Sequence, residues 1–217
     1  MAGIQVTPEP TQEPLTLQEV KDYLRIEDST DERLIRSLIE TARRFAEEHM
    51  GRSLMSQTLT QFIDGYDEMH DPLFEGFSTG PFLTYYKNYI TLARPPVTSV
   101  TSVSTFDDAD TETTFASSKY YLDNVREPSR IMLRNGENFP TALRVANAIK
   151  IVFVSGYANA YAVPEPIKLG MLQHIAHLYE HRGDMYESQG YPPSLMKLYQ
   201  PYTVLKGLYS STLLSVG

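Results

Sequence analysis

Apolar residues in this 217-residue chain change their spacing twice, and this change limits the folds open to it. Between Leu34 and Ala46 they recur every three to four residues, as on one face of an amphipathic helix. Between Ser53 and Val154 they form short runs rich in Val, Ile, Thr and Tyr, separated by turn residues. After Gly156 the helical spacing returns. The order predicts an α+β fold: a small helical bundle with an inserted antiparallel β domain and an extended C-terminal tail.

Three helices are expected to build the bundle. The first is expected to begin after Thr16, because Thr16 and Glu19 have the spacing of a capping box. A second box, Ser29 and Glu32, is expected to start the next helix, which Gly51 ends. A late helix is expected between Pro164 and Gly183. Apolar residues of the second and late helices fall on one stripe each: Leu34, Ile35, Leu38, Ile39, Ala42, Phe45 and Ala46, then Ile167, Met171, Leu172, Ile175, Leu178 and Tyr179.

The middle of the chain predicts seven short strands. They are expected at residues 53–63, 89–92, 97–106, 113–115, 119–122, 130–133 and 149–154. Residues Asp64–Asn88 have no clear period and are interpreted as a long loop. Three acidic residues near Asp108 offer too few oxygen ligands for calcium and indicate a solvated hairpin tip.

The domain boundaries follow from these elements. We expect a flexible arm at residues 1–14, a helical bundle at 15–52 and 164–202, an inserted β domain at 53–163, and a C-terminal docking tail at 203–217. The last 30 residues contain only two charged side chains, Lys197 and Lys206, but many apolar and aromatic ones. Solvated disordered tails are highly charged and poor in aromatics. The composition therefore predicts a tail that is buried, either on its own domain or in a partner.

Composition excludes several classes of protein. The chain has no cysteine, which excludes a disulfide framework, a thiolate metal site and a cysteine nucleophile. No apolar run approaches the length of a membrane span, and the start lacks a signal-peptide pattern. A net charge of −8 argues against a protein that wraps nucleic acid by neutralising phosphates. A soluble protein made inside the cell, with no membrane partner, is the expectation.

One string has the pattern of a catalytic motif. His177-Leu178-Tyr179-Glu180-His181 matches the H-x-x-E-H arrangement of inverted zinc peptidases, and His174 lies one turn earlier. A third protein ligand is lacking at a suitable place downstream, and the helix is expected to end at Gly183. Histidines at a helix border facing a neighbour are therefore favoured over a zinc peptidase or a metal site shared between subunits. We predict no catalytic residue, no metal and no cofactor.

Three stretches give the chain a resemblance to a known family. They are Leu15–Leu24 with Asp31–Ile39 and Ala42–Glu47, then Pro164–Lys168 leading into His177–Arg182, and finally Leu195–Tyr202 with its Pro-Tyr end. In their order and content they resemble the head–tail connector (adaptor) proteins of tailed bacteriophages and gene transfer agents. The resemblance implies a helix-bundle core, a ring of typically twelve subunits beneath the portal, and a C-terminal segment inserted into the portal.

The sequence is therefore interpreted as a virion structural protein of the neck, without enzymatic activity, that continues the DNA channel from head to tail. Its expected partners are the portal protein, further copies of itself, a stopper or tail-completion protein, and passing double-stranded DNA bound without sequence specificity. Candidate portal-docking residues are Leu195, Leu198, Tyr199, Pro201, Tyr202, Leu205, Leu208, Tyr209, Leu213 and Leu214. Candidate subunit-interface residues are Arg36, Glu40, Arg43, Arg44, His174, His177 and His181.

Two alternatives remain open at this stage. The protein is a tail-completion or stopper component of the same particle, or an acidic DNA-mimic or regulatory protein that is monomeric and does not bind a portal. A zinc peptidase is the remote enzymatic alternative.

Overall fold

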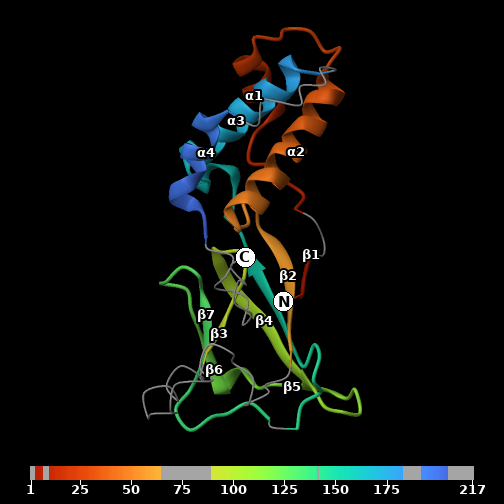
Figure 1. Ribbon diagram of the computed structural model, residues 1–217, viewed down its shortest axis with the longest axis vertical. Coiled ribbons are helices and arrows are strands. Elements are labelled where there is room, and N and C mark those ends of the chain that lie inside the picture. The colour runs from red at the N-terminus through yellow and green to blue at the C-terminus, as the bar shows by residue number, and fades with distance from the viewer. Residues whose placement is uncertain (1–2, 7–9, 65–88, 141, 183–191, 205–217) are drawn as a thin grey trace, which may run out of the picture. The chain divides into compact units, whose positions relative to one another are not determined.

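A computed structural model describes residues 3–6, 10–64, 89–140, 142–182 and 192–204 (Figure 1). The chain folds into two compact units. The helical unit comprises Pro10–Ser56 and Tyr157–Val204. The β unit contains Gln57–Gly156 together with a strand from the start of the chain. The middle of the sequence is thus inserted between the two halves of the helical unit.

The helical unit contains four α-helices: α1 (Leu17–Leu24), α2 (Glu32–Met50), α3 (Glu165–Glu180) and α4 (Pro193–Tyr199). Short 3-10 turns at Ala160–Ala162 and Gln200–Tyr202 precede α3 and follow α4. The Thr16 hydroxyl accepts the Glu19 N–H at 3.2 Å, and the Glu19 carboxylate accepts the Thr16 N–H at 2.6 Å. This reciprocal pair is the capping box expected for the first helix.

The second helix starts differently from the prediction. Its N-cap is Asp31 instead of Ser29, and no side chain caps it by a hydrogen bond. Its end is as expected, because Gly51 adopts a left-handed φ of 68° and its N–H bonds back to the Glu47 carbonyl.

The helical core lies between α1, α2, α3 and α4. Its fully buried side chains include Ile35, Met50, Ile167, Met171 and Tyr199. They come from both halves of the chain, so the two halves of the helical unit fold together, as the amphipathic stripes required.

The β unit has two antiparallel sheets. Its strands are β1 (Gly3–Val6), β2 (Gln57–Ile63), β3 (Tyr89–Thr91), β4 (Val97–Phe106), β5 (Glu112–Thr114), β6 (Tyr120–Asp123), β7 (Arg130–Leu133) and β8 (Ile149–Ser155). The larger sheet has the order β1-β2-β8-β4-β5, and the smaller has the order β3-β7-β6. Figure 1 shows the long strands β2 and β4 running through this unit.

Alternation along the strands builds the core of the β unit. In β8 the side chains of Ile149, Ile151 and Phe153 are buried and those between them are partly exposed. The Gln61 side chain joins β2 to the smaller sheet, since its amide donates to the Thr91 carbonyl at 3.1 Å and its oxygen accepts the Ala93 N–H at 3.0 Å. The sheets therefore share an apolar core with one buried amide as a crosslink.

The predicted α+β class with an inserted antiparallel β domain is confirmed. The flexible arm expected at residues 1–14 was wrong in part, because Gly3–Val6 pair with β2, with Ile4 opposite Gln61. Most of the Asp64–Asn88 loop and residues 205–217 of the predicted tail lie outside the described residues.

Candidate assembly interface

The predicted docking residues divide into buried and accessible ones. Leu195 and Tyr199 of α4 are fully buried in the helical core. Their side chains pack inside this unit, so their prediction as docking residues was wrong. Leu198 and Tyr202 are half-buried, and Pro201 is exposed. The other five candidates, Leu205, Leu208, Tyr209, Leu213 and Leu214, lie outside the described residues.

A close contact explains why α4 is buried. An ideal Cβ on Gly170 of α3 would lie 2.5 Å from the Cε1 atom of Tyr199, so only glycine leaves room for this ring. The Tyr199 hydroxyl is buried without a hydrogen-bond partner, and burial raises the pKa of this hydroxyl well above its ordinary value. Helices α3 and α4 thus approach each other closely through a glycine and an aromatic ring.

Hydrogen bonds hold the described residues after α4 to the rest of the helical unit. Arg52 donates one hydrogen bond to the Tyr202 carbonyl at 3.0 Å and another to the Tyr157 hydroxyl at 2.9 Å. The Val204 N–H donates to the Met50 carbonyl at 2.7 Å, at the C-terminal end of α2. Residues 205–217 therefore continue from a defined point on the helical unit.

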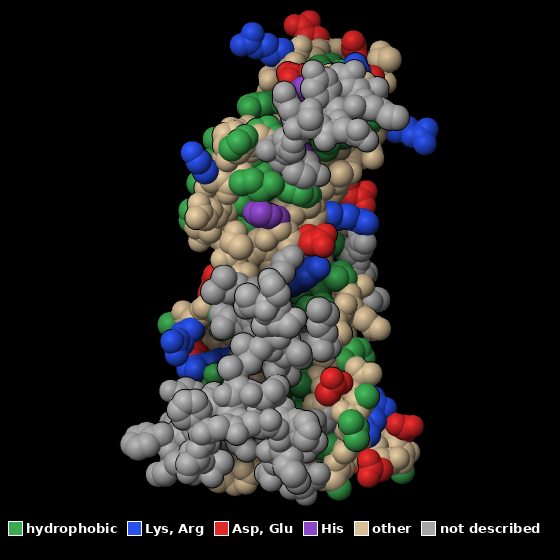
Figure 2. Space-filling view, viewed as in Figure 1, with side chains coloured by type: hydrophobic (Ala, Val, Ile, Leu, Met, Phe, Trp, Pro, Cys, Tyr) green, Lys and Arg blue, Asp and Glu red, His purple; other side chains and the backbone are tan. Residues whose placement is uncertain are grey.

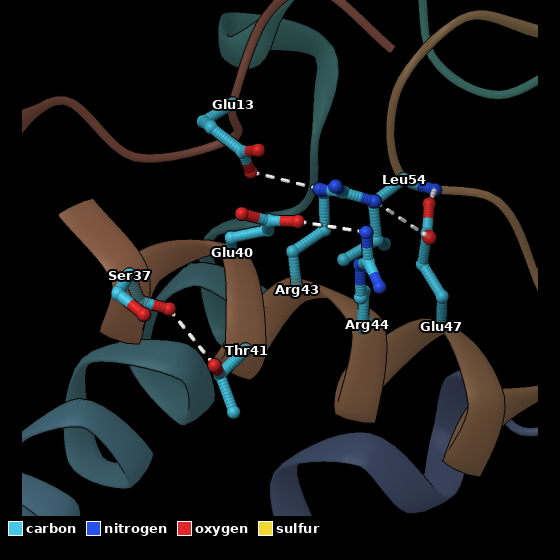
Figure 3. A network of polar contacts seen from close by, with 8 residues as sticks. All are labelled: Glu13, Ser37, Glu40, Thr41, Arg43, Arg44, Glu47 and Leu54. Atoms are coloured by element: carbon cyan, nitrogen blue, oxygen red, sulfur yellow. Dashed lines mark hydrogen bonds and ion pairs between the residues drawn. The ribbon is translucent and has the colours of Figure 1, made fainter. Parts of the chain in front are cut away.

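Arg43 was expected at a subunit interface, but it belongs to an internal ion-pair network (Figure 3). Its guanidinium is 3% exposed and contacts Glu13 at 2.8 Å and Glu47 at 3.1 Å. The second Glu47 oxygen accepts the Leu54 N–H at 2.8 Å. Burial raises the pKa of the Glu13 carboxyl, although Arg43 opposes this shift. Arg43 is therefore not available to a neighbouring subunit.

The other charged candidates on α2 are accessible. Arg36, Glu40 and Arg44 are exposed, and Arg44 contacts Glu40 at 2.7 Å across one helical turn. Both members of this pair are about half exposed, so the ion pair adds little to stability. These three residues form the charged α2 face.

The three candidate histidines of α3 lie in different surroundings. His174 is 1% exposed and packs edge-on against Phe45 of α2, with ring centroids 4.6 Å apart. Burial, with a smaller effect from His177, lowers the pKa of His174 to about 4. It is therefore a core residue, and its prediction as an interface residue was wrong. His177 is half-buried and His181 exposed, with their rings 4.4 Å apart.

The end of α3 is tied to the start of α2. Asp31 accepts hydrogen bonds from the Tyr179 hydroxyl at 2.5 Å and from Arg182 at 3.0 Å. These bonds lower the pKa of the Asp31 carboxyl. The Arg182 guanidinium also stacks over the Tyr179 ring, 4.2 Å from its centroid. Tyr179 of the H-x-x-E-H string thus has a structural partner on another helix.

An apolar groove on the helical unit was not foreseen. About 430 Å³ in volume, it is lined by Leu15, Glu19, Glu165, Pro166, Lys168, Leu169, Leu172 and Leu198. Leu169 is 41% exposed and lies outside the predicted stripe of α3, which was the available signal in the sequence. Figure 2 shows hydrophobic side chains exposed between charged ones on the visible face of the helical unit.

Neither a metal site nor a membrane span is found among the residues described in the structure. They contain no group of three or more histidine and acidic side chains able to hold a metal ion. None of their helices is long and apolar enough to cross a membrane.

Comparison with known proteins gives one sequence match and several matches of fold. Residues 14–76 match the family of phage gp6-like head-tail connector proteins, a segment that spans α1, α2 and β2. No curated protein matches the chain.

Similar folds occur in solved gene transfer agent (GTA) particles. A chain from the virion of a native particle has a TM-score of 0.69 at 19% identity, covering 94% of this chain and 98% of its own. A chain from the neck of an empty particle, computed with C6 symmetry, has a TM-score of 0.69 at 21% identity, covering 95% and 96%. One from the neck of a native particle, computed with C12 symmetry, has a TM-score of 0.63 at 20% identity, covering 95% and 96%.

The two kinds of match agree. One is a match of sequence over the first two helices, and the other is a match of fold over nearly the whole length of the chain. The predicted resemblance is confirmed: this chain is similar to the head–tail connector proteins.

Proposed function

We propose that this protein is a structural component of a phage-like neck, a head–tail connector that forms a ring below the portal and continues the DNA channel toward the tail. The observation that carries the proposal is the connector sequence match at residues 14–76 within a fold shared with chains of solved neck assemblies. No catalytic step enters this function, and the H-x-x-E-H string acts as helix sequence.

Ring formation needs two different faces of each subunit, because a closed ring joins copies head to tail. The charged α2 face (Arg36, Glu40 and Arg44) supports this arrangement, since its charges of both signs are exposed. A similar chain comes from a neck computed with C12 symmetry, which supports twelve copies. His177 and His181 are the remaining interface candidates on α3.

Portal docking is assigned to the C-terminal segment 205–217 with the accessible residues just before it. Leu198, Pro201 and Tyr202 are partly or fully exposed, and the segment itself carries five of the predicted docking residues. An apolar peptide with one charged residue is suited to a hydrophobic groove on a partner.

The net charge is consistent with a channel protein. At −8 per subunit, a ring repels the phosphates of passing DNA, which discourages adsorption. The channel role therefore needs no base contact and no cofactor.

Electron microscopy of the purified protein mixed with its portal tests the proposal. We expect a ring of this protein seated directly on the portal. A density that appears only after another neck protein is added would identify a stopper or tail-completion component instead. A monomer with no portal affinity would overturn both assignments in favour of a regulatory protein.

A truncation tests the docking segment. Val204 is buried and bonded to Met50, so the deletion should begin at residue 205 to leave the helical unit intact. The shortened protein should retain its circular dichroism spectrum and lose co-assembly with the portal. Undiminished co-assembly would refute the assignment of this segment.

The enzymatic alternative has its own test. Metal analysis of the purified protein should find no stoichiometric zinc, and His177→Ala should change no hydrolytic activity. Stoichiometric zinc that disappears in His177→Ala would restore the peptidase hypothesis.

A further inference from the structure

The apolar groove of the helical unit has no role in the proposed function. Its leucines come from three places in the chain: Leu15 before α1, Leu169 and Leu172 on α3, and Leu198 on α4. Leu169 is 41% exposed, whereas most leucines of the described chain are buried or half-buried. An exposed apolar groove of this kind is typical of a binding site for an apolar side chain or peptide.

The chain itself offers a matching occupant. Segment 205–217 contains four leucines and a valine, and its one charged residue is Lys206. In water such a segment exposes apolar surface that a groove would cover. The groove lining carries Glu19, Glu165 and Lys168; Lys168 contacts Glu165 at 2.9 Å, so the lining has one net negative charge, which complements Lys206.

The starting point of the segment favours its own groove. Leu198 lines the groove, and Val204 follows it by only six residues. The groove residues of α3 lie in its first turns, and Arg52 joins Tyr157, just before that helix, to the Tyr202 carbonyl. The groove and Val204, the last described residue, thus lie near the same end of the helical unit.

The length of the segment and its high local concentration also favour binding to the groove of its own chain. Thirteen residues span up to about 43 Å when extended, which is ample for folding back along a helical unit of this size. A short tether gives an effective concentration on the order of millimolar, far above the concentration of other copies in a dilute solution.

We propose that in the free subunit the C-terminal segment 205–217 lies in the groove of its own chain, with leucine side chains against Leu169 and Leu172. The groove then shields the segment before assembly. If this segment also docks into the portal, docking and groove binding compete, but the groove site stands without that assignment.

The absence of cysteine makes a direct test possible. Leu169→Cys combined with Leu208→Cys or Leu213→Cys gives a protein with two thiols and no others. A matched control pairs the same tail cysteine with Tyr161→Cys, on a residue that is 93% exposed in the same unit but outside the groove.

Under mild oxidation at low protein concentration, a groove pair should form an intramolecular disulfide at least about tenfold faster than the control pair. Equal rates for groove and control pairs would overturn the proposal. Disulfide-linked dimers that form faster than the intramolecular product would also overturn it, by placing the segment in another copy.

A second measurement needs no cross-link. Leu169→Glu changes an exposed residue and should leave the fold intact, as checked by circular dichroism. Protease cleavage within residues 205–217 should become several-fold faster than in the unchanged protein. Unchanged cleavage in the folded variant would contradict groove binding.

The two proposals fail separately. Leu169→Glu should still co-assemble with the portal, whereas deletion from residue 205 should not. If the cross-linking and cleavage experiments contradict groove binding while portal binding is retained, only the groove proposal fails and the connector function is unaffected.

Discussion

The helical unit and the β unit bury different kinds of polar side chain. The helical unit buries five charged residues: Lys21, Arg43, Glu47, Arg52 and Lys168. In the described part of the β unit, the buried polar residues are all neutral: Gln57, Gln61, Ser104, Thr105, Ser129 and Ser155. Arg130 and Asp123, its most enclosed ion pair, are 24% and 18% exposed.

The two units are therefore stabilised by different kinds of interaction. The β unit depends on strand ladders and on alternating apolar residues, which tolerate a change of charge at the surface. The helical unit contains buried charges that pair with distant residues, such as Arg43 with Glu13, and loss of one member of a buried pair is costly. The helical unit should therefore be the more sensitive of the two to charge substitutions and to pH.

The largest effect is expected from Arg43→Met, which removes the guanidinium that contacts the Glu13 and Glu47 carboxylates. Loss of one member of a buried pair costs about 3–5 kcal/mol, and we expect the free energy of unfolding of the helical unit to fall by about that amount. Arg130→Met is the matched change in the β unit and should cost about 1 kcal/mol. Urea titration with peptide-resolved hydrogen exchange measures both. Equal losses would break the comparison.

A pH titration gives the next effect. The pKa of His174 is about 4 in the folded protein and near 6.5 when unfolded, so the unfolded chain binds more protons between these values. Stability is therefore present above pH 6.5 and falls as the pH drops toward 4, by about 3 kcal/mol in total.

His174→Phe should flatten this decline, because a phenyl ring keeps the contact with Phe45 and binds no proton. His181→Gln, at an exposed position, is the control and should leave the slope unchanged. Urea midpoints at pH 7 and pH 5 decide the question, and the same slope in His174→Phe would assign the decline to other groups.

Gly170→Ala tests the contact between α3 and α4. The new Cβ would meet Tyr199 at 2.5 Å, and overpacking of this kind costs about 1–3 kcal/mol, partly offset by the higher helix propensity of alanine. Gly3→Ala in the β unit is the control, since its Cβ would lie 4.0 Å from the Phe62 Cβ, an ordinary contact. Thermal denaturation should show a lower Tm for Gly170→Ala and an unchanged Tm for Gly3→Ala.

The smallest effect is expected from Asp31→Asn. The amide oxygen still accepts a hydrogen bond from Tyr179, but the charge facing Arg182 is lost. Because this ion pair is well exposed, the change in unfolding free energy should be smaller than for any variant above. Hydrogen exchange at the end of α3 should increase while that of β8 stays constant. A global loss of stability would mean that this contact is part of the core.

Most helices and strands could be predicted because the residues that mark each of them lie within the element or directly beside it. The bounds of β4 and β7 match the predicted runs, since alternating residues and turn residues mark them. Strand β1 was missed because four residues beside Pro8 carry a weak pattern, and its partner β2 lies more than fifty residues away.

The errors at the candidate interface have the same origin. Arg43 and Glu47 have the spacing of a surface pair on a helix, and only the distant Glu13 shows that Arg43 is enclosed. Tyr199 was taken as a docking residue because the space left for it by Gly170 is a tertiary feature. The groove depends on three segments meeting, which no single stretch of sequence contains.

The way in which the chain leaves and re-enters the helical unit has a consequence for its architecture. Met55 and Tyr157, close to the two crossing points, pair with each other in a β-bridge. All buried residues of the helical core lie in 15–55 or 163–199. Because this bridge is parallel, the chain runs in the same direction at Met55 and Tyr157, so a shortened protein that keeps this core needs a flexible linker between them and not a tight turn. Because the helical core takes no buried residue from positions 56–156, we expect the helical unit to retain its core when this inserted segment is replaced.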